Sequence, residues 1–341
     1  MKKRYLFAGA AAVVAAGITA KLLSRPHDVV WRESAKELNH AEDSYFVTVD
    51  GIRLHYQEAG PEDGPAVLLI HGFCASNQVW SEVFLPLARA GFRVIAPDLV
   101  GYGFSEKPSD FDYTIDAQAM IIIHLLDGLQ IEHALVVGSS YGGAIAVTCA
   151  LDYSNRVRRL VLVGAVINDE ATKQPLLRLA IQPLLGDLIA PLLLDSRLLM
   201  RWRMTQVYSP SNAHLMTEER IQTRHRPLRA ASTHRAVVKT LRNWRANRVQ
   251  EQAADVLQPT LIIWGDSDLD TPVKDGERLR GEIPDSRLFI FRRCGHLPQE
   301  EYPDRFLELL IPFLLSGNEG RLEVALSSDS SRKRLNSETI T

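Results

Sequence analysis

The sequence is poor in cysteine and has no excess charge of either sign. Its 341 residues include three cysteines, Cys74, Cys149 and Cys294, whose spacing matches neither a disulfide framework nor a metal site. The 39 basic and 41 acidic side chains nearly cancel, so the chain has no overall positive field that would attract nucleic acid. Hydrophobic residues make up 46% of this long chain, which is enough to bury a core without a disulfide or a metal. We therefore expect a globular protein of ordinary composition.

Long apolar runs are missing as well, with one exception near the start of the chain. Residues 2–4 are basic and precede the uncharged run 5–20, which is close to the roughly 20 residues that cross a bilayer. We expect residues 1–25 to form an apolar helix that anchors the protein in a membrane as a single pass, with the body exported. The alternatives are a cleaved signal peptide, giving a secreted or periplasmic protein, and a helix packed on the body. The tail, residues 316–341, is rich in serine and charge and is expected to be disordered.

Apolar runs typical of strands alternate with helical patterns from about residue 45. Strands are expected over residues 45–49, 53–58, 66–70, 93–96, 134–137, 159–163, 260–264 and 287–291. Helices are expected over residues 78–90, 115–129, 141–153, 274–280 and 302–315. Asp50-Gly51, between the first two strands, predicts a hairpin. This order predicts an α/β fold with a mostly parallel sheet flanked by helices.

The alternation stops between residues 166 and 248, where the sequence predicts an inserted helical cap. Residues 26–165 and 249–315 would then be the two parts of one core. The first half of the insertion holds eleven leucines between residues 176 and 200. The second half holds ten arginines and one lysine against two glutamates, between residues 201 and 248. This basic half predicts either a solvated helix face or a surface that attracts anionic lipid or an anionic substrate.

A nucleophile is predicted where a strand passes directly into a helix. Residues 138–142 read Gly-Ser-Ser-Tyr-Gly, which is G-x-S-x-G in the strand–turn–helix context that this motif requires. The register makes Ser140 the nucleophile, and the structural alternative is a serine that caps the helix. A dinucleotide site is excluded, because Ser140 stands where G-x-G-x-x-G needs its second glycine.

A serine nucleophile needs a base, and the base needs a carboxylate that orients it. His296 follows the last strand, at the sheet edge where catalytic groups gather in open α/β sheets, and we assign it as the base. Three aspartates follow the preceding strand. Asp268 is chosen as the acid from its Gly-x-x-Asp spacing, whereas Asp266 and Asp270 are expected to hold the turn through local hydrogen bonds.

Two backbone N–H groups are needed to stabilise the negative oxygen of a tetrahedral intermediate. Phe73 lies in the loop after the third strand, and Tyr141 follows the nucleophile directly. We assign the N–H groups of Phe73 and Tyr141 to this oxyanion hole. His71, in the same loop as Phe73, is expected to organise that loop rather than act as a second base.

Taken together, these segments resemble the α/β-hydrolase superfamily, in its cap-bearing branch. The matching segments are residues 71–73, 96–105, 138–142, 265–272 and 294–298, in the family's order. The resemblance covers roughly residues 45–315 and implies that Asp98 organises a loop. Epoxide hydrolases and haloalkane dehalogenases of this branch carry aspartate where this chain has Ser140. Carbon–carbon bond hydrolases use serine, but usually carry Gly-Pro-Gly where Phe73 and the three residues after it stand here.

The residues and the resemblance predict a serine hydrolase that cleaves carboxylic esters of lipophilic substrates through an acyl-enzyme on Ser140, esterase- or lipase-like. The leucine-rich half of the cap would line an acyl pocket. One alternative is a carbon–carbon bond hydrolase of the same fold. Another is a catalytically silent, membrane-tethered binding protein, which the intact set of Ser140, Asp268 and His296 disfavours. We expect a small-molecule or lipid ester and the membrane as partners, and no cofactor, metal or nucleic acid.

Overall fold

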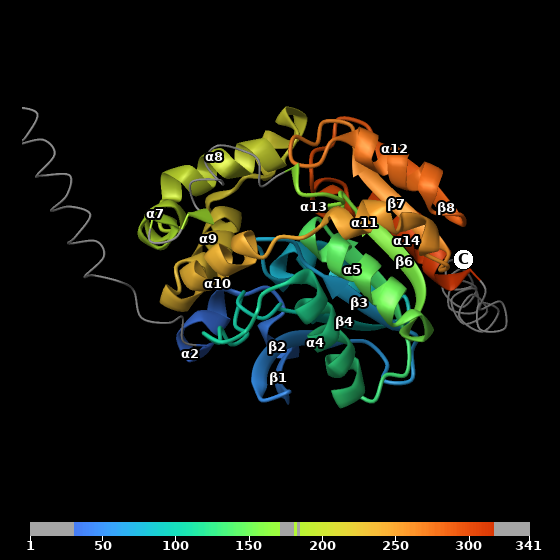
Figure 1. The fold of residues 1–341 in the computed structure, drawn as a ribbon, viewed down its shortest axis with the longest axis horizontal. Helices are drawn as coiled ribbons and strands as arrows, with labels where there is room; N and C mark the ends of the chain where they lie inside the picture. The colour runs from blue at the N-terminus through green and yellow to red at the C-terminus, as the bar shows by residue number, and fades with distance from the viewer. Residues whose placement is uncertain (1–30, 171–180, 183–184, 317–341) are drawn as a thin grey trace, which may run out of the picture.

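An eight-stranded sheet forms the centre of the molecule (Figure 1). The computed structural model describes residues 31–170, 181–182 and 185–316. The strand order is β1-β2-β4-β3-β5-β6-β7-β8. β1 (Ser44–Val49) and β2 (Ile52–Ala59) form the predicted hairpin, in which Asp50 and Gly51 both have positive φ, as a two-residue turn of this type requires.

The remaining strands run parallel to one another, as the alternating pattern predicts. They are β3 (Ala66–Ile70), β4 (Arg93–Pro97), β5 (Ala134–Ser139), β6 (Val157–Val163), β7 (Thr260–Gly265) and β8 (Ser286–Phe291). Every residue of β3, β5 and β7 is buried. Apart from Ser139 at the end of β5 and Thr260 at the start of β7, their residues are apolar, because helices cover the sheet on both faces.

Alternate residues of each strand contact different helix layers. Val67 and Leu69 pack with α3 (Ser81–Arg89) and α14 (Pro303–Leu315) on one face. Leu68 and Ile70 pack on the other face, in one cluster with side chains of α4 (Ile115–Gly128), α5 (Tyr141–Asp152) and α12 (Val273–Glu282). The period of two along a strand therefore divides the core into two layers.

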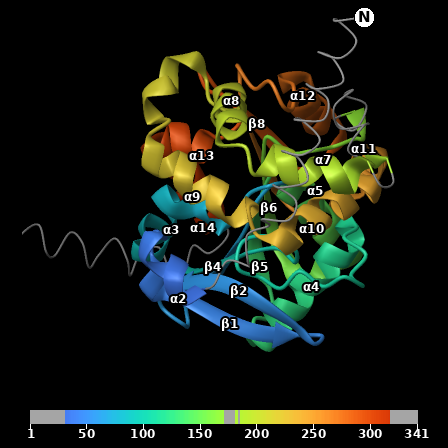
Figure 2. The same cartoon turned by 90° about the vertical axis from the view of Figure 1, so that its left-hand side faces the viewer.

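Between β6 and β7 the described residues form helices and no strand. These helices are α7 (Leu185–Leu194), α8 (Arg197–Val207), α9 (Glu218–Leu228), α10 (Ala231–Arg242) and α11 (Asn247–Glu251). Both views show α7 to α10 grouped beside one edge of the strands (Figures 1 and 2). Local signals explain two of the helix starts, because Ser196 caps α8 and Thr217 caps α9 through side-chain oxygens.

The basic half of this insertion pairs with acidic groups of the core. Four of its arginines form ion pairs with carboxylates outside residues 166–248: Arg203 with Asp270, Arg220 with Glu82, Arg224 with Glu300, and Arg248 with Asp116 and Asp152. The sequence suggested that these arginines form a solvated surface or one that attracts anionic lipid or substrate. Several of them instead join the insertion to the core.

The membrane location expected from the N-terminal run is corrected by the structure. In the part of the chain that the structure describes, no helix combines the length and apolarity needed to cross a bilayer. The run itself, residues 1–25, lies outside the described residues, and so does the apolar helix expected there. Residues 317–341 of the tail also lie outside them.

Candidate active site

Ser140 stands at the turn between β5 and α5 in a backbone conformation that side chains rarely adopt. Its φ is 55° and its ψ −120°. Its backbone N–H donates to Val163 O at 2.9 Å, and its carbonyl accepts from Gly143 N and Val166 N at 2.9 Å each. These three hydrogen bonds hold the backbone of the turn in its strained conformation. The Ser140 side chain does not cap α5, so the structural alternative for this serine is not realised.

Gly142, the second glycine of the G-x-S-x-G motif, is necessary because α5, β3 and the loop after β3 approach one another closely here. A Cβ on Gly142 would lie 2.3 Å from the carbonyl oxygen of Ile70 in β3, and a Cβ on Gly72 would lie 2.9 Å from Cβ of Ser140. Gly142 therefore lets the first turn of α5 rest on β3. The loop after β3 is consequently brought directly against the serine.

His296 and Asp268 form a buried hydrogen-bonded pair. His296 Nδ1 donates to Asp268 Oδ2 at 2.7 Å, and the two residues are 5% and 8% exposed. The other Asp268 oxygen accepts from Asp270 N at 2.8 Å and Thr271 N at 3.0 Å, and the Thr271 hydroxyl donates to Oδ2 at 2.9 Å. With Nδ1 carrying its proton toward Asp268, Nε2 is the acceptor.

Electrostatics favour the charged form of His296. Burial lowers the pKa of His296, but the charge of Asp268 and its hydrogen bond outweigh burial, with a further contribution from Asp270, and the pKa lies above its usual value. A histidine whose protonated form is favoured in this way is suited to accept a proton from a serine hydroxyl.

The candidate nucleophile, acid and base come from the ends of neighbouring parallel strands. Ser140 follows β5, Asp268 follows β7 and His296 follows β8. Gly164, at the end of β6, lies between them, since a Cβ there would be 3.1 Å from His296 Nδ1. Three backbone hydrogen bonds of 2.9 Å hold this edge together: Ser140 N to Val163 O, Gly164 N to Ile263 O and Asp266 N to Phe291 O.

The two residues assigned to the oxyanion hole also lie beside Ser140. Tyr141 is the first residue of α5, so its N–H is one of the donors that the helix itself leaves without a partner. Phe73 follows Gly72, which touches Ser140. The rings of Phe73 and Tyr141 both pack on Trp244, with centroids 5.4 and 5.0 Å apart. The two residues that carry the assigned donors are therefore joined through one aromatic cluster.

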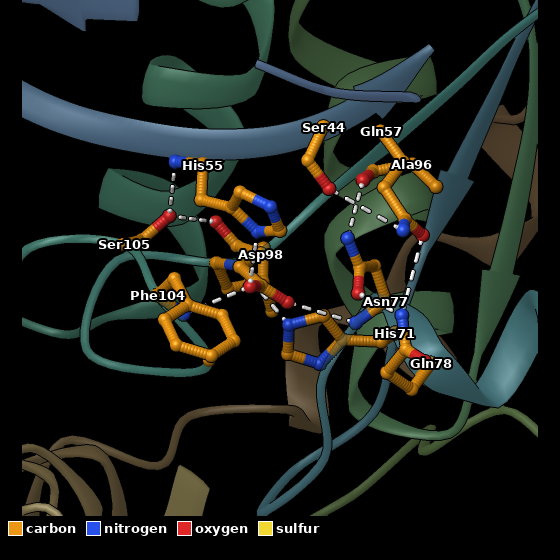
Figure 3. Close-up of polar contacts among 12 residues, drawn as sticks. Ser44, His55, Gln57, His71, Asn77, Gln78, Ala96, Asp98, Phe104 and Ser105 are labelled. Carbon is orange, nitrogen blue, oxygen red and sulfur yellow. Dashed lines mark hydrogen bonds and ion pairs between the residues drawn. The ribbon is translucent and has the colours of Figure 1, made fainter. Parts of the chain in front are cut away.

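A neutral histidine organises the loop that carries Phe73 (Figure 3). Leu99 N–H donates to His71 Nε2 at 3.0 Å, and His71 Nδ1 donates to Gly72 O at 2.8 Å. Burial lowers the pKa of His71, and with both ring nitrogens engaged the side chain has no proton to exchange with a substrate. His71 thus has the structural role that its position in the sequence suggested.

Asp98 is the centre of the network in Figure 3, beside His71. Its carboxylate accepts from His55 Nδ1 at 2.7 Å, Asn77 N at 2.8 Å and Phe104 N at 2.9 Å. Burial alone would raise the pKa of Asp98, but the hydrogen bond and charge of His55 bring it to about 2. Asp98 therefore holds together the segments after β3 and β4, as a loop organiser does.

The structure gives the other two aspartates contacts that differ from the local side-chain-to-backbone bonds expected of them. Asp266 accepts from the Ser267 hydroxyl at 2.8 Å and from the backbone N–H of Cys294, 28 residues away, at 3.3 Å. The carboxylate of Asp270 pairs with Arg203 of α8 and comes within 3.9 Å of His296 Nε2. Sequence reasoning missed this contact, since its partner is 67 residues away along the chain.

Sequence reasoning also missed the carboxylate that supports the His296 loop. Glu301, in α13 (Pro298–Glu301), is 6% exposed and accepts from Gly295 N at 2.7 Å. It also accepts from Ser209 N at 3.0 Å and Asn212 Nδ2 at 2.7 Å, both in the insertion. The backbone N–H of His296 donates to Val207 O at 2.7 Å. The histidine loop is therefore bonded directly to the end of α8 and the segment after it.

Two features lie away from this site. The donor atoms of His40, Glu42 and Asp43, which could ligate a metal, all lie within 4.8 Å of one another. A cavity of about 720 Å³ is lined by Asp43, Tyr45, Glu58 and neighbours at the β1–β2 hairpin and α3. Neither includes Ser140 or His296.

Comparison with known proteins places the chain in a family. A family model described as "alpha/beta hydrolase fold" matches residues 65–303. The 2-hydroxy-6-oxononadienedioate/2-hydroxy-6-oxononatrienedioate hydrolase of Paraburkholderia phymatum is 32% identical over 285 residues, covering 80% of this chain and 96% of the relative. The solved meta-cleavage product hydrolase of Pseudomonas fluorescens is 29% identical, covers 80% of this chain and 97% of its own, and has a TM-score of 0.67.

A third likeness is to a protein whose name describes ester chemistry. The solved structure of a membrane phospholipase A is 25% identical, with a TM-score of 0.67, and covers 92% of this chain and 98% of its own. The relatives thus span at least two kinds of hydrolase on one fold. The matching family model and the coverage of these relatives show that this chain belongs to the α/β-hydrolase family.

Proposed function

We propose that this α/β hydrolase cleaves a bond at a carbonyl carbon through an acyl-enzyme on Ser140. The observation that carries the proposal is the His296–Asp268 pair, held at 2.7 Å at the strand ends beside the strained Ser140 turn. A serine on such a turn, with a buried and oriented histidine nearby, is the arrangement that acyl transfer uses.

The proposed reaction begins when Nε2 of His296 accepts the Ser140 hydroxyl proton. The serine oxygen then bonds to the carbonyl carbon, and the N–H groups of Phe73 and Tyr141 stabilise the resulting oxyanion. Asp268 keeps the Nδ1 proton in place, which favours the imidazolium that forms. The intermediate collapses as the leaving group takes the proton from His296. Water then attacks the acyl-enzyme by the same steps in reverse.

The leaving group is the point on which the two candidate functions differ. The comparisons favour a carbon leaving group, since the Paraburkholderia phymatum and Pseudomonas fluorescens relatives are named for such substrates. In that reaction the 2-hydroxy dienoate would first become its 2-oxo tautomer, which moves the hydroxyl proton to the carbon beside the 6-carbonyl. The electron pair of the broken carbon–carbon bond would then be delocalised onto the 2-oxo oxygen, and the dienol would leave as that oxygen takes the proton from His296. Of the two, we therefore put carbon–carbon bond hydrolysis ahead of the ester hydrolysis that the sequence alone suggested.

Ester hydrolysis is retained as a second candidate on two specific observations. Phe73-Cys74-Ala75-Ser76 stands where carbon–carbon bond hydrolases usually carry Gly-Pro-Gly. The likeness to the membrane phospholipase A extends over more of this chain than the likeness to the meta-cleavage hydrolase.

Burial raises the pKa of the Cys74 thiol to about 12, so this cysteine in the oxyanion loop is no competing nucleophile.

A direct comparison of substrates tests the proposal. The purified protein is assayed with 2-hydroxy-6-oxo-6-phenylhexa-2,4-dienoate, followed by loss of its conjugated absorbance, and with p-nitrophenyl esters of increasing chain length. We expect kcat/KM for the dienoate to be at least tenfold above that for the esters, and turnover in both series to fall by several orders of magnitude with Ser140→Ala. Equal turnover by Ser140→Ala and the unmodified protein would refute the role of Ser140 in whichever reaction is seen.

A further inference from the structure

A second carboxylate faces the candidate base from the side opposite Asp268. Asp268 contacts Nδ1 of His296, whereas Asp270 Oδ2 lies 3.9 Å from Nε2, the nitrogen that must accept the serine proton. The Asp270 side chain is 22% exposed. The two carboxylates therefore bracket one imidazole, although they belong to the same short loop after β7.

The Asp270 carboxylate is held by a guanidinium from the insertion. Arg203 of α8 makes a two-pronged contact, with Nη1 2.9 Å from Asp270 Oδ1 and Nη2 bonded to Oδ2. This fork geometry fixes the carboxylate plane more tightly than a single bond would. The contact also joins α8 to the loop that carries Asp268.

The charges around His296 require such a partner. The groups that bear on its ring are Asp268, Asp270 and Arg203, and Thr271 contributes a neutral hydroxyl. The nearby acids Asp266 and Glu301 are turned to backbone N–H groups of the His296 loop. Two unopposed carboxylates would hold a proton on Nε2 and so block its function as a base. The Arg203 charge opposes this effect.

Asp270 itself is ionised in this setting. Burial would raise the pKa of Asp270, but the charges of His296 and Arg203 lower it below its usual value. A charged Asp270 freed from Arg203 would be able to accept a hydrogen bond from a protonated Nε2. The ring would then be engaged with Asp270 and unavailable to Ser140.

We propose that Asp270 and Arg203 form a pair of positioning residues that keeps Nε2 of His296 available to Ser140. The pair acts through His296 and does not touch the reacting carbonyl. The inference rests on the proposed function of Ser140 and His296. It assigns to α8 a direct part in setting the state of the base, in addition to covering the strand ends.

Variants that remove one charge at a time test this inference. Arg203→Gln, Asp270→Asn and the double variant are compared with the unmodified protein. The His296 titration is followed by NMR of protein labelled with ¹⁵N-histidine, with the resonance identified through His296→Asn. We expect Arg203→Gln to move the titration up by roughly one pH unit and Asp270→Asn to move it down by a similar amount, because each removes one charge of opposite sign near the ring. The double variant should fall between the two.

The rate of covalent labelling by a fluorophosphonate, measured against pH, gives an independent readout at Ser140. Its acid limb should move in the same directions as the titration. Arg201→Gln is the matched control, because Arg201 lies on the same helix and pairs with the exposed Glu218. It should leave both profiles unchanged.

The outcomes separate this inference from the proposed function. Shifts of the same sign in the two single variants, or no shift in either, would overturn the role of the pair even if labelling is normal. Opposite shifts in the NMR titration without any labelling of the unmodified protein would support the effect of the pair on the His296 pKa, while refuting the role of Ser140 and with it the part of the proposal that concerns Ser140. Arg203→Lys, which keeps the charge without the fork, guards against a folding defect and should shift the titration less than Arg203→Gln.

Discussion

Replacing Gly164 by alanine is expected to damage catalysis more than it damages folding. Gly164 has φ +50°, and an added Cβ would lie 3.1 Å from His296 Nδ1 and 3.2 Å from Asp268 Oδ2. Both distances are shorter than ordinary van der Waals contact, so the acid and base must shift by a few tenths of an ångström. A displacement of that size costs roughly fourfold in turnover, given that about 1 Å costs a hundredfold.

Alanine at the positive φ of Gly164 also lowers the free energy of unfolding, whatever the added Cβ contacts. A second glycine at positive φ, with open space around it, measures this backbone effect alone. Gly51 in the β1–β2 turn has φ +80° and open space where a Cβ would stand. Each alanine variant should lose about 1 kcal/mol of unfolding free energy, measured by urea denaturation, because alanine is strained at positive φ. Fluorophosphonate labelling should slow in Gly164→Ala alone. Equal labelling rates in the two variants would refute the argument that Gly164 makes room for the His296–Asp268 pair.

Three further predictions concern the reaction and the loop beneath it. Ser140→Ala should abolish labelling and lower turnover by several orders of magnitude, whereas Ser139→Ala should keep most activity; the reverse result would contradict the register of the turn. Asp268→Asn should lower turnover roughly 10⁴-fold, because the Nδ1 proton loses its acceptor, and Asp266→Asn should lower it far less, as measured by steady-state kinetics. The folded pKa of Asp98, about 2, lies below its usual 3.8, so Asp98 contributes stability above about pH 4 that is lost as pH falls toward 2. The gap in unfolding free energy between the unmodified protein and Asp98→Asn should shrink by about 2 kcal/mol over that interval, and a constant gap would count against this account.

The sheet and the turn at Ser140 were predictable because their signals are local. A parallel strand covered on both faces is almost entirely apolar, and β3, β5 and β7 all read this way. The Ser140 turn needs small residues at fixed offsets, and Gly142 supplies one of them against β3. The carboxyl ends of parallel strands meet at one edge of a sheet. Ser140, Asp268 and His296 could therefore be assigned to one site, although they are far apart in the sequence. The roles of Ser140, Asp268 and His296 remain predictions, since the structure gives their arrangement and not their chemistry.

Contacts between distant segments were not predictable in the same way. Asp270 was expected to stabilise its own turn, because aspartate often does so, but Asp268 makes those bonds instead. Asp270 pairs with Arg203, and the facing of α8 that brings this arginine to it is set by tertiary packing. Likewise, nothing near Glu301 in the sequence indicates that its donors lie at Ser209 and Asn212.

The structure does not test the acyl pocket expected from the leucine-rich half of the insertion. Residues 171–180 and 183–184 lie outside the described part of the chain, and so do the side chains of Leu188 and Leu192. The lining of the pocket therefore stays a prediction from the leucine-rich pattern. In place of these leucines, the structure describes an aromatic cluster: the rings of Phe73 and Tyr141, the two residues assigned to the oxyanion hole, both contact the ring of Trp244.

The contacts between insertion and core bear on how this hydrolase controls access to its site. Exposed ion pairs contribute little each, about 0–1 kcal/mol, so the charge complementarity of the two parts is mainly a matter of orientation. Val207 O accepts from the His296 backbone N–H, and Ser209 N donates to Glu301, which itself accepts from Gly295 of the histidine loop. If the insertion moved away at this end, the His296 N–H would lose its acceptor and Glu301 would lose the donors Ser209 and Asn212. Any opening that admits substrate should therefore leave the end of α8 in place and occur elsewhere in the insertion, so that the base keeps its position while the entrance changes.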